Sequence, residues 1–423
     1  MANILVVATD VLPIGNGVTT GAGLRAWGLG QGLAGRGHHV EFAMPTIAAE
    51  GTGSGTDRTV HVFELAALDD LVDQIDPEII VFQHWPLVGA LNKPLRARVV
   101  IDFAGPLLLE TLFREPSDVE RHIGSKMQAL QKADYFTCAG IKQMYYYLSW
   151  LLIAGVDVRQ IPISVVPFSL SPDLPKHTFP KDPLFVYGGF FLPWQDPMLG
   201  FEVLIEALDR QYSGKLKIFG GEHPWVKLPD HPLSALRTKM EGAHHVEFLP
   251  PAPLDQLNQI YCRASVAWDL MARNPEREIA FTSRTVGYLW CGLPVVYNNY
   301  SELSSYIDEY DAGWTVDPSD ATAIRAVVDE IFERPEVVRQ KGTNAQRLVR
   351  ERLTWDLTID PLDDYCRRAF RVPRFSEHAL LSPVPTVANG LGGPPPRLIR
   401  RQLSRARRLA LRLLKGLVHA RLR

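Results

Sequence analysis

The chain has 423 residues, of which 46% are hydrophobic and 22% are charged, as is usual for a soluble globular protein of two or three domains. This composition excludes a collagen-like chain and a chain that is disordered throughout. The cysteines at positions 138, 262, 291 and 366 form neither a zinc pattern nor a clustered disulfide framework. They favour a reducing, cytoplasmic environment.

The net charge of −2 hides an asymmetry along the chain. Residues 397–423 carry ten basic and no acidic side chains, whereas the other 396 residues carry 35 basic and 47 acidic ones, a net charge of −12. A basic tail of this kind indicates a partner of its own, such as a membrane surface. The acidic body disfavours a nucleic-acid enzyme, and we expect no nucleic-acid partner.

The N-terminus predicts a first strand rather than a signal peptide. Its apolar run has no charged segment before it and meets Asp10. No window of about 18 residues is both apolar and free of charge, so we expect no transmembrane helix.

The first half of the chain alternates strands and helices. The expected helices include residues 22–35 and 118–133. Short runs rich in β-branched residues predict buried strands at residues 3–8, 40–43, 60–63, 79–82, 99–101, 135–138 and 164–166.

A second cycle of the same kind begins near Pro183. Its expected helices span residues 199–209, 254–261, 281–290 and 321–333. Its expected strands span residues 184–187, 215–219, 246–249, 266–270 and 294–297. The sequence therefore predicts an α/β protein with two Rossmann-like domains facing a central cleft, at the carboxyl ends of the strands.

We place the domain boundaries where prolines and glycines accumulate. The first domain spans residues 1–168, a linker 169–182, and the second domain 183–371, whose last helix can cross back to the first domain. Residues 372–396 contain six prolines and three glycines and are expected to form a second linker.

The tail, residues 397–423, has the pattern of a basic amphipathic helix. Apolar residues from Ile399 to Leu417 recur every three or four positions on one face, and Arg and Lys residues occupy the other. This pattern is typical of a helix that lies on an anionic membrane surface. A helix that docks onto the acidic body is the alternative.

Three loops follow expected strands and could approach a phosphate-bearing ligand. The first contains Gly15 and Gly17, and the second contains Gly188 and Gly189. The third leads through Glu276 to a helix start with these candidate phosphate ligands: Thr282, Ser283 and Arg284. A flexible loop and a tight turn are the alternatives for the first two loops. For the third, helix capping and a solvated loop acid are the better explanations when its residues are taken singly.

Together these segments resemble a known family. The order of the first glycine loop, Val165-Val-Pro-Phe, Gly188-Gly-Phe and Gly292-Leu-Pro-Val-Val is similar to that of the GT-B fold glycosyltransferases grouped as family 4. Asp102-Phe-Ala-Gly-Pro and Trp194-Gln-Asp-Pro resemble a subgroup found among bacterial surface-polysaccharide enzymes. The resemblance covers about residues 1–370.

The resemblance implies a retaining glycosyltransferase that uses a nucleotide-sugar as substrate, with no cofactor and no obligatory metal. It implies a catalytic role for Glu276 and Arg284, and donor binding by Gly15, Gly17, Gly188, Gly189, Thr282 and Ser283. The donor would lie on the second domain. The acceptor, a glycan or a lipid-linked sugar, would lie on the first.

Two departures from the family pattern stand out. Counted back from Gly292, the second Glu of the family's E-x7-E motif falls at Gly287 and the first at Ile279, so Glu276 fits only if its loop shifts. The Arg and Lys that follow the second glycine turn in the family are absent, and we expect Arg284, Arg273 or the helix N-terminus to neutralise the phosphates.

In the first domain His84 and Asp102 end expected strands that point toward the cleft. Either could bind the acceptor hydroxyl or accept its proton. We expect three further residues to contact the acceptor: Arg25, Trp194 and Glu110.

The sequence thus predicts an enzyme of polysaccharide synthesis, peripheral on the cytoplasmic face of the membrane. The oligomeric state, the donor and the acceptor stay open. Two alternatives also stay open: a nucleotide-sugar epimerase on the same fold, and a non-catalytic glycan-binding or scaffold protein, suggested by Gly287.

Overall fold

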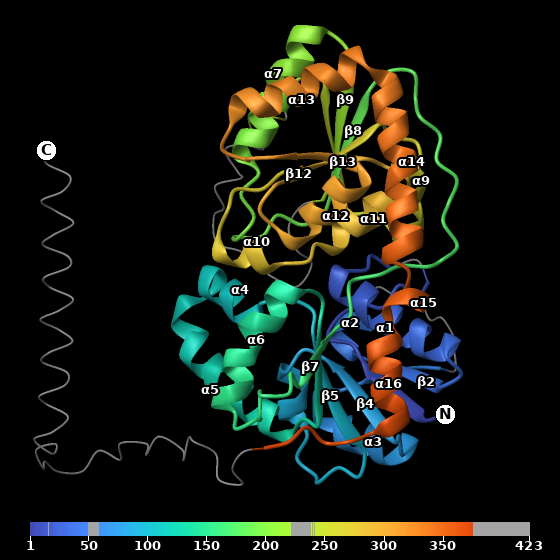
Figure 1. Cartoon of the computed structure of the whole chain (residues 1–423), viewed down its shortest axis with the longest axis vertical. Coiled ribbons are helices and arrows are strands. Elements are labelled where there is room, and N and C mark those ends of the chain that lie inside the picture. The colour runs from blue at the N-terminus through green and yellow to red at the C-terminus, as the bar shows by residue number, and fades with distance from the viewer. Residues whose placement is uncertain (16, 50–58, 221–237, 239, 241, 375–423) are drawn as a thin grey trace, which may run out of the picture. The chain divides into compact units, whose positions relative to one another are not determined.

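The computed structural model describes residues 1–15, 17–49, 59–220, 238, 240 and 242–374, which belong to one compact unit, Met1–Leu380. The expected tail at residues 397–423 and most of the second linker lie outside the described residues. Two parallel sheets, each covered by helices, make up the described chain (Figure 1). In the described part of the chain, no helix is long and apolar enough to cross a membrane.

The first sheet has seven parallel strands in the order β3-β2-β1-β4-β5-β6-β7. They are β1 (Asn3–Val7), β2 (His39–Pro45), β3 (Val60–Phe63), β4 (Ile79–Gln83), β5 (Arg98–Phe103), β6 (Tyr135–Cys138) and β7 (Ile163–Val165). The helices that follow these strands are α1 (Gly21–Gly35), α2 (Thr46–Ala49), α3 (Leu68–Ile75), α4 (Leu107–Arg114), α5 (Val119–Lys132) and α6 (Ile141–Ile153).

The second sheet has six parallel strands in the order β10-β9-β8-β11-β12-β13. They are β8 (Leu184–Gly188), β9 (Lys215–Phe219), β10 (Val246–Leu249), β11 (Val266–Asp269), β12 (Val295–Asn298) and β13 (Gly313–Val316). Its helices are α7 (Met198–Gln211), α9 (Leu254–Tyr261), α10 (Pro275–Ile279), α11 (Ser283–Trp290), α12 (Glu302–Tyr310), α13 (Ala321–Glu333) and α14 (Pro335–Arg352).

Alternate residues of each buried strand supply two different cores, because successive side chains of a strand point to opposite faces. On β11, Val266 and Trp268 pack into the core on one face of the second sheet, and Ala267 packs into the core on the other. Both faces are apolar, which explains why these strands are continuous apolar runs in the sequence.

The chain reverses direction across each sheet at one point, between β1 and β4 in the first and between β8 and β11 in the second. Ligands of open parallel sheets bind at such switch points, beyond the carboxyl ends of the strands. The topology therefore predicts that a ligand binds at the residues that follow β1, β4, β8 and β11.

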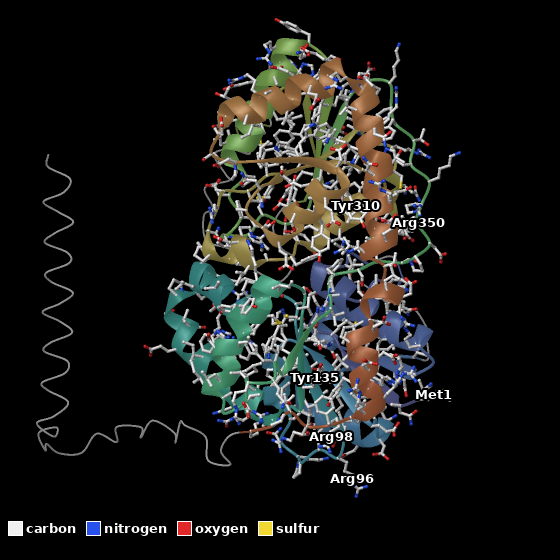
Figure 2. The ribbon with its side chains drawn as sticks, in the orientation of Figure 1. Met1, Arg96, Arg98, Tyr135, Tyr310 and Arg350 are labelled. Carbon is white, nitrogen blue, oxygen red and sulfur yellow. The ribbon has the colours of Figure 1, made fainter. Side chains whose placement is uncertain are left out.

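The chain crosses between the two sheets twice. The backbone of Leu170 bonds to that of Leu353 and Trp355, so the two crossings run side by side. Two short helices, α15 (Trp355–Thr358) and α16 (Asp360–Arg368), then return to the first sheet. Tyr365 stacks on Tyr135 of β6 at 4.1 Å between ring centroids. Figure 2 labels Tyr135 in the lower part of the view.

The expectations for the fold agree with the structure except at a few points. The predicted α/β class with two parallel-sheet domains is confirmed. The strand β13 was not expected, and helix α11 begins at Ser283, two residues later than expected. Val372, assigned to the second linker, is buried in the core of the first sheet.

Candidate active site

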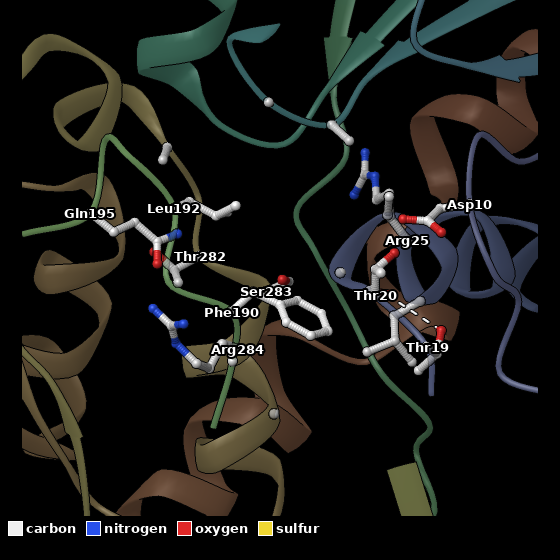
Figure 3. A pocket seen from close by; sticks show the side chains of 18 of the residues that line it. Asp10, Thr19, Thr20, Arg25, Phe190, Leu192, Gln195, Thr282, Ser283 and Arg284 are labelled. Atoms are coloured by element: carbon white, nitrogen blue, oxygen red, sulfur yellow. Dashed lines mark hydrogen bonds between the residues drawn. The ribbon is translucent and has the colours of Figure 1, made fainter. Parts of the chain in front are cut away.

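A cavity of about 540 Å³ opens at the switch points of both sheets. The residues that line it follow β1 and β4 in the first sheet and β8 in the second, and include the start of α11 (Figure 3). A volume of this size is in the range of small-molecule and cofactor sites. In Figure 3, Arg25 and Asp10 lie on one side of the cavity, and Arg284 and Gln195 lie on the other.

Arg284 lies under the glycine turn that follows β8. Its Nη2 donates to Asp269 Oδ1 at 2.8 Å and its Nη1 to the Tyr187 hydroxyl at 2.9 Å. Its Nε is buried and, in the described structure, has no hydrogen-bond partner. Arg284 lines the cavity, where its fixed positive charge can attract a ligand anion.

The glycine turn itself needs residues without a side chain. Gly189 has φ of +148°, which other residues rarely adopt. A Cβ on Gly188 would collide with the hydroxyl of Tyr261, and one on Gly189 with the guanidinium of Arg284. Both glycines line the cavity, as the sequence predicted.

Glu276 is held rigidly at the cavity wall. The side chain of Asn274 caps α10 by accepting from the backbone N–H groups of Glu276 and Arg277, both at 3.0 Å. Arg277 donates two hydrogen bonds to the Glu276 carboxylate, from Nε at 2.5 Å and from Nη2 at 2.7 Å. Glu276 is only 1% exposed, yet it lines the cavity.

Glu110 reaches the same region from the first sheet. It lies on α4, which contacts α10, and it lines the cavity together with Arg114. Burial and the nearby charge of Glu276 raise the pKa of Glu110 to about 8. The Glu110 carboxyl is therefore mostly protonated at neutral pH and can donate a hydrogen bond to a ligand oxygen.

His84 and Asp102, both predicted to face the cleft, differ in position. His84 lines the cavity, its Nδ1 has no hydrogen-bond partner among the residues that the structure describes, and burial lowers its pKa to about 4. Asp102 is fully buried behind it and is not among the residues that line the cavity. It accepts two hydrogen bonds from Arg25 and one from Thr137, which makes it a positioning residue rather than a group in reach of an acceptor.

The residues predicted to bind the donor do not all lie at the cavity. Neither Gly15 nor Gly17 lines the cavity, but the next residues of that loop, from Val18 to Ala22, do. The Thr282 hydroxyl pairs with Tyr297 at 2.8 Å, and Ser283 opens α11 against Gly21. Both line the cavity.

Arg273, expected to neutralise phosphate, points elsewhere. Its side chain is 62% exposed, pairs with Glu278 and is not among the cavity residues. Arg25 and Trp194, both expected to contact the acceptor, do line the cavity.

Sequence reasoning missed several polar residues of the cavity, including Gln195 and Arg277. Gln195 lines the cavity with a buried Oε1 that has no partner among the described atoms, and Arg277 fixes Glu276. The only signal for Gln195 was its position beside Trp194. In the described parts of the chain, no group of three or more His, Cys, Asp or Glu side chains is placed to hold a metal ion.

Comparison with known proteins gives a family model and many similar structures. Residues 175–348 match the model described as Glycosyl transferases group 1. No curated protein sequence matches the chain.

The sucrose-phosphate synthase of Thermosynechococcus elongatus is 16% identical with a TM-score of 0.66, over 86% of this chain and 98% of its own. The lipopolysaccharide glycosyltransferase WaaG is 12% identical with a TM-score of 0.60, over 86% and 99%. Anabaena HepE, solved with UDP-glucose, is 15% identical with a TM-score of 0.60, over 88% and 100%.

At these identities the structures establish the shared fold, while the family model covers most of the second domain and part of the linker before it. The chain thus has the two-domain GT-B fold of glycosyltransferases, and its residues 175–348 match the glycosyl transferases group 1.

Proposed function

We propose that the chain is a retaining glycosyltransferase that moves a sugar from a nucleotide-sugar to a glycan or lipid-linked acceptor in bacterial cell-surface polysaccharide synthesis. One observation carries the proposal: at the switch points of two sheets, a cavity combines the guanidinium of Arg284 with the carboxyl groups of Glu110 and Glu276. The relative from Anabaena, solved with UDP-glucose, supports the choice of donor class.

The donor's diphosphate would lie at Arg284 and the start of α11. As the sugar leaves, negative charge grows on the diphosphate, and groups already oriented toward it lower the barrier. Asp269 and Tyr187 fix the guanidinium of Arg284, so its positive charge is already oriented at the cavity wall before a phosphate binds. The first N–H groups of α11, from Ser283 onward, lack partners within the helix and add further donors.

The donor sugar would lie between Glu276 and Glu110. The Glu276 carboxylate, held by Arg277, accepts hydrogen bonds from sugar hydroxyls, and protonated Glu110 donates one. The acceptor oxygen bonds to the anomeric carbon on the face from which the diphosphate departs, which retains the configuration. The acceptor's proton passes to the departing phosphate oxygen, so the step balances and requires no metal.

Attachment to the inner face of the cytoplasmic membrane is the part of the proposal that rests on residues 397–423. Their ten basic charges and apolar stripe suit an anionic bilayer, at about 1 kcal/mol for each basic residue near the surface. Liposomes containing anionic lipid should float the full chain and not a chain truncated at Pro394. Equal flotation of both chains would exclude the tail as the anchor.

The direct test of the proposal is a thermal-shift screen of nucleotide-sugars, followed by a transfer assay with the one that binds. A shift selective for one nucleotide, and sugar transfer to a lipid-linked or free glycan, are expected. The absence of binding to every nucleotide diphosphate would favour a glycan-binding or scaffold protein.

A nucleotide-sugar epimerase is the second candidate, because the cavity brings together the acids and the histidine that proton abstraction needs. Asp10, Glu110, Glu276 and His84 all line it. Incubation of the bound nucleotide-sugar without acceptor separates the two: a change of sugar configuration indicates an epimerase, and an unchanged sugar favours transfer.

A further inference from the structure

A second cavity, of about 430 Å³, opens at the opposite edge of the first sheet. It is lined by the segment from Leu91 to Val99, which leads into β5, and by Asp134, which directly precedes β6. The strands are parallel, so this amino-end pocket lies at their amino ends, whereas the active-site cavity lies at their carboxyl ends. Its volume is in the range of small-molecule sites.

The described wall of the amino-end pocket is basic. The positively charged residues that line it are Lys93, Arg96, Arg98, Lys132 and Arg371, and the acid beside them is Asp134. Figure 2 labels Arg96 and Arg98 in the lower part of the view. A concave surface with a surplus of positive charge attracts anionic ligands.

Two of these arginines share one carboxylate. Buried Asp134 places its Oδ1 3.4 Å from Arg98 Nη1 and 3.7 Å from Arg371 Nε. Arg98 also donates to the carbonyl of Ala369 at 3.0 Å. Arg371 donates to the carbonyl of Gln131 at 3.3 Å. Each guanidinium has five N–H donors, more than these contacts use, and one carboxylate cannot neutralise both charges.

Structural contacts account for only part of the remaining charge. Lys93 pairs with Asp73 of α3 at 2.6 Å. Lys132 Nζ donates to the carbonyl of Leu91 at 2.8 Å, which holds an ammonium group with further N–H donors at the pocket wall. Arg96 is exposed on the segment before β5. Lys132 and Arg96 can therefore add their charges to those of the two arginines.

The pKa of a neighbouring arginine reflects the same surplus of positive charge. Burial and the charge of Arg371 lower the pKa of Arg374 to about 10, although Asp134 opposes the shift. Positive groups held this close together repel one another. A bound anion would relieve that repulsion.

We propose that the amino-end pocket binds a phosphate group. The forks of two arginines match the oxygens of a phosphate, and Lys132 adds a compact charge beside them. A lipid headgroup and a soluble phosphate ester are the two sources of such a group. Residues 375–423, which follow Arg374, carry ten basic side chains and one acidic one, so a tail bound to an anionic bilayer would raise the concentration of lipid phosphate near the pocket.

Lysine acetylation of the full chain, measured by mass spectrometry, tests the site directly. A ligand in the pocket should slow the acetylation of Lys132 several-fold, and should leave the exposed Lys176 and Lys215 unchanged as internal controls. One probe is glycerol 3-phosphate, compared with sodium chloride at the same ionic strength. The other is vesicles of phosphatidylcholine and phosphatidylglycerol in equal parts, compared with vesicles of phosphatidylcholine alone.

Each outcome decides the proposal. Protection of Lys132 by glycerol 3-phosphate would support a soluble ester as the ligand, and protection by the anionic vesicles alone would support a lipid headgroup. Protection by neither probe would overturn the proposal. Equal protection by sodium chloride, or equal slowing at Lys176 and Lys215, would show general screening and would also overturn it.

A charge reversal tests the assigned place. Arg96→Glu changes the pocket wall, and Arg339→Glu makes the same change at an exposed position of α14. We expect Arg96→Glu to raise the apparent Kd of the protecting probe about five-fold or more, and Arg339→Glu to leave it within about two-fold. Unchanged protection in a folded Arg96→Glu chain would reject the proposal. A chain without transferase activity could still bind phosphate here, because neither Arg96 nor Lys132 lines the active-site cavity.

Discussion

Arg25 and Asp102 form a two-point ion pair inside the first domain. Arg25 Nε donates to Asp102 Oδ2 at 3.0 Å and Nη2 to Oδ1 at 2.8 Å, and the two residues are 3% and 0% exposed. A third hydrogen bond, from Arg25 Nη1 to the carbonyl of Pro167 at 2.9 Å, reaches the first crossing. The pair joins α1, the end of β5 and the crossing between the sheets.

Asp102→Asn should destabilise the chain by about 3 kcal/mol or more, because it leaves the buried charge of Arg25 unpaired. Urea unfolding of the variant and the wild-type chain measures this loss. A double variant, Arg25→Met with Asp102→Asn, removes both charges and should lose less than Asp102→Asn alone. A loss below about 1 kcal/mol in the single variant would contradict the importance of the pair.

Arg284→Ala should abolish transfer and also lower stability. Asp269 is 1% exposed and would lose its charged partner. The double variant Arg284→Met with Asp269→Asn leaves no buried charge unpaired and should recover much of the stability. Single-turnover assays of that double variant should still show a loss of about 100-fold or more. A well-folded double variant with wild-type turnover would remove Arg284 from catalysis.

Stability should depend on pH through Glu110. The fold raises the pKa of Glu110 from its ordinary value of 4.5 to about 8. Between these two pH values, Glu110 holds a proton in the folded chain that it has released in the unfolded chain. Stability therefore falls as pH rises through this window. The charged neighbours in this effect are Glu276, Arg277 and Arg114.

Glu110→Gln keeps the hydrogen-bond donor and cannot ionise, so it should flatten this dependence and preserve turnover above pH 8, where the wild-type chain declines. Urea unfolding and rates measured from about pH 6 to pH 9 test both points. Parallel profiles for variant and wild type would contradict a raised pKa for Glu110.

His84 has φ of +61°, a conformation that costs a non-glycine residue about 1–3 kcal/mol. His84→Gly should therefore be more stable than His84→Ala by about 1 kcal/mol, although both lack the imidazole. The same two substitutions at Ser149, on the exposed face of α6, should show the reverse order, because glycine is unfavourable in a helix. Equal stability of the two His84 variants would argue against strain at this position.

The local pattern of apolar residues in the sequence predicted most of the strands and helices of the fold. Buried parallel strands are short apolar runs, and their ends were predicted to within a few residues. Strand β13 was missed because Gly313 opens a four-residue run and weakens its pattern. The return of α16 to the first sheet is a long-range contact that periodicity does not encode.

The candidate site was predicted less well than the fold. Gly188, Gly189 and the start of α11 line the cavity because local geometry places them at strand ends, whereas Gly15 and Gly17 do not line it. Arg273 was expected to face the phosphates and Arg277 was not considered. The cap of Asn274 starts α10 and leaves Arg277 buried beside Glu276, which no local sequence pattern shows. Asp102 ends a strand as expected, but only tertiary packing with Arg25 shows that it lies behind the cavity.

The return of α16 also has a consequence for synthesis on the ribosome. Ile359, Leu362 and Tyr365 complete the core of the first sheet, although the strands of that sheet end at Val165. The first domain to be translated therefore cannot finish its core until the second has been made. Because the ribosome makes the chain from its N-terminus, the surface around Tyr135 would stay open to solvent, or to chaperones, until nearly all of the described chain has left the ribosome.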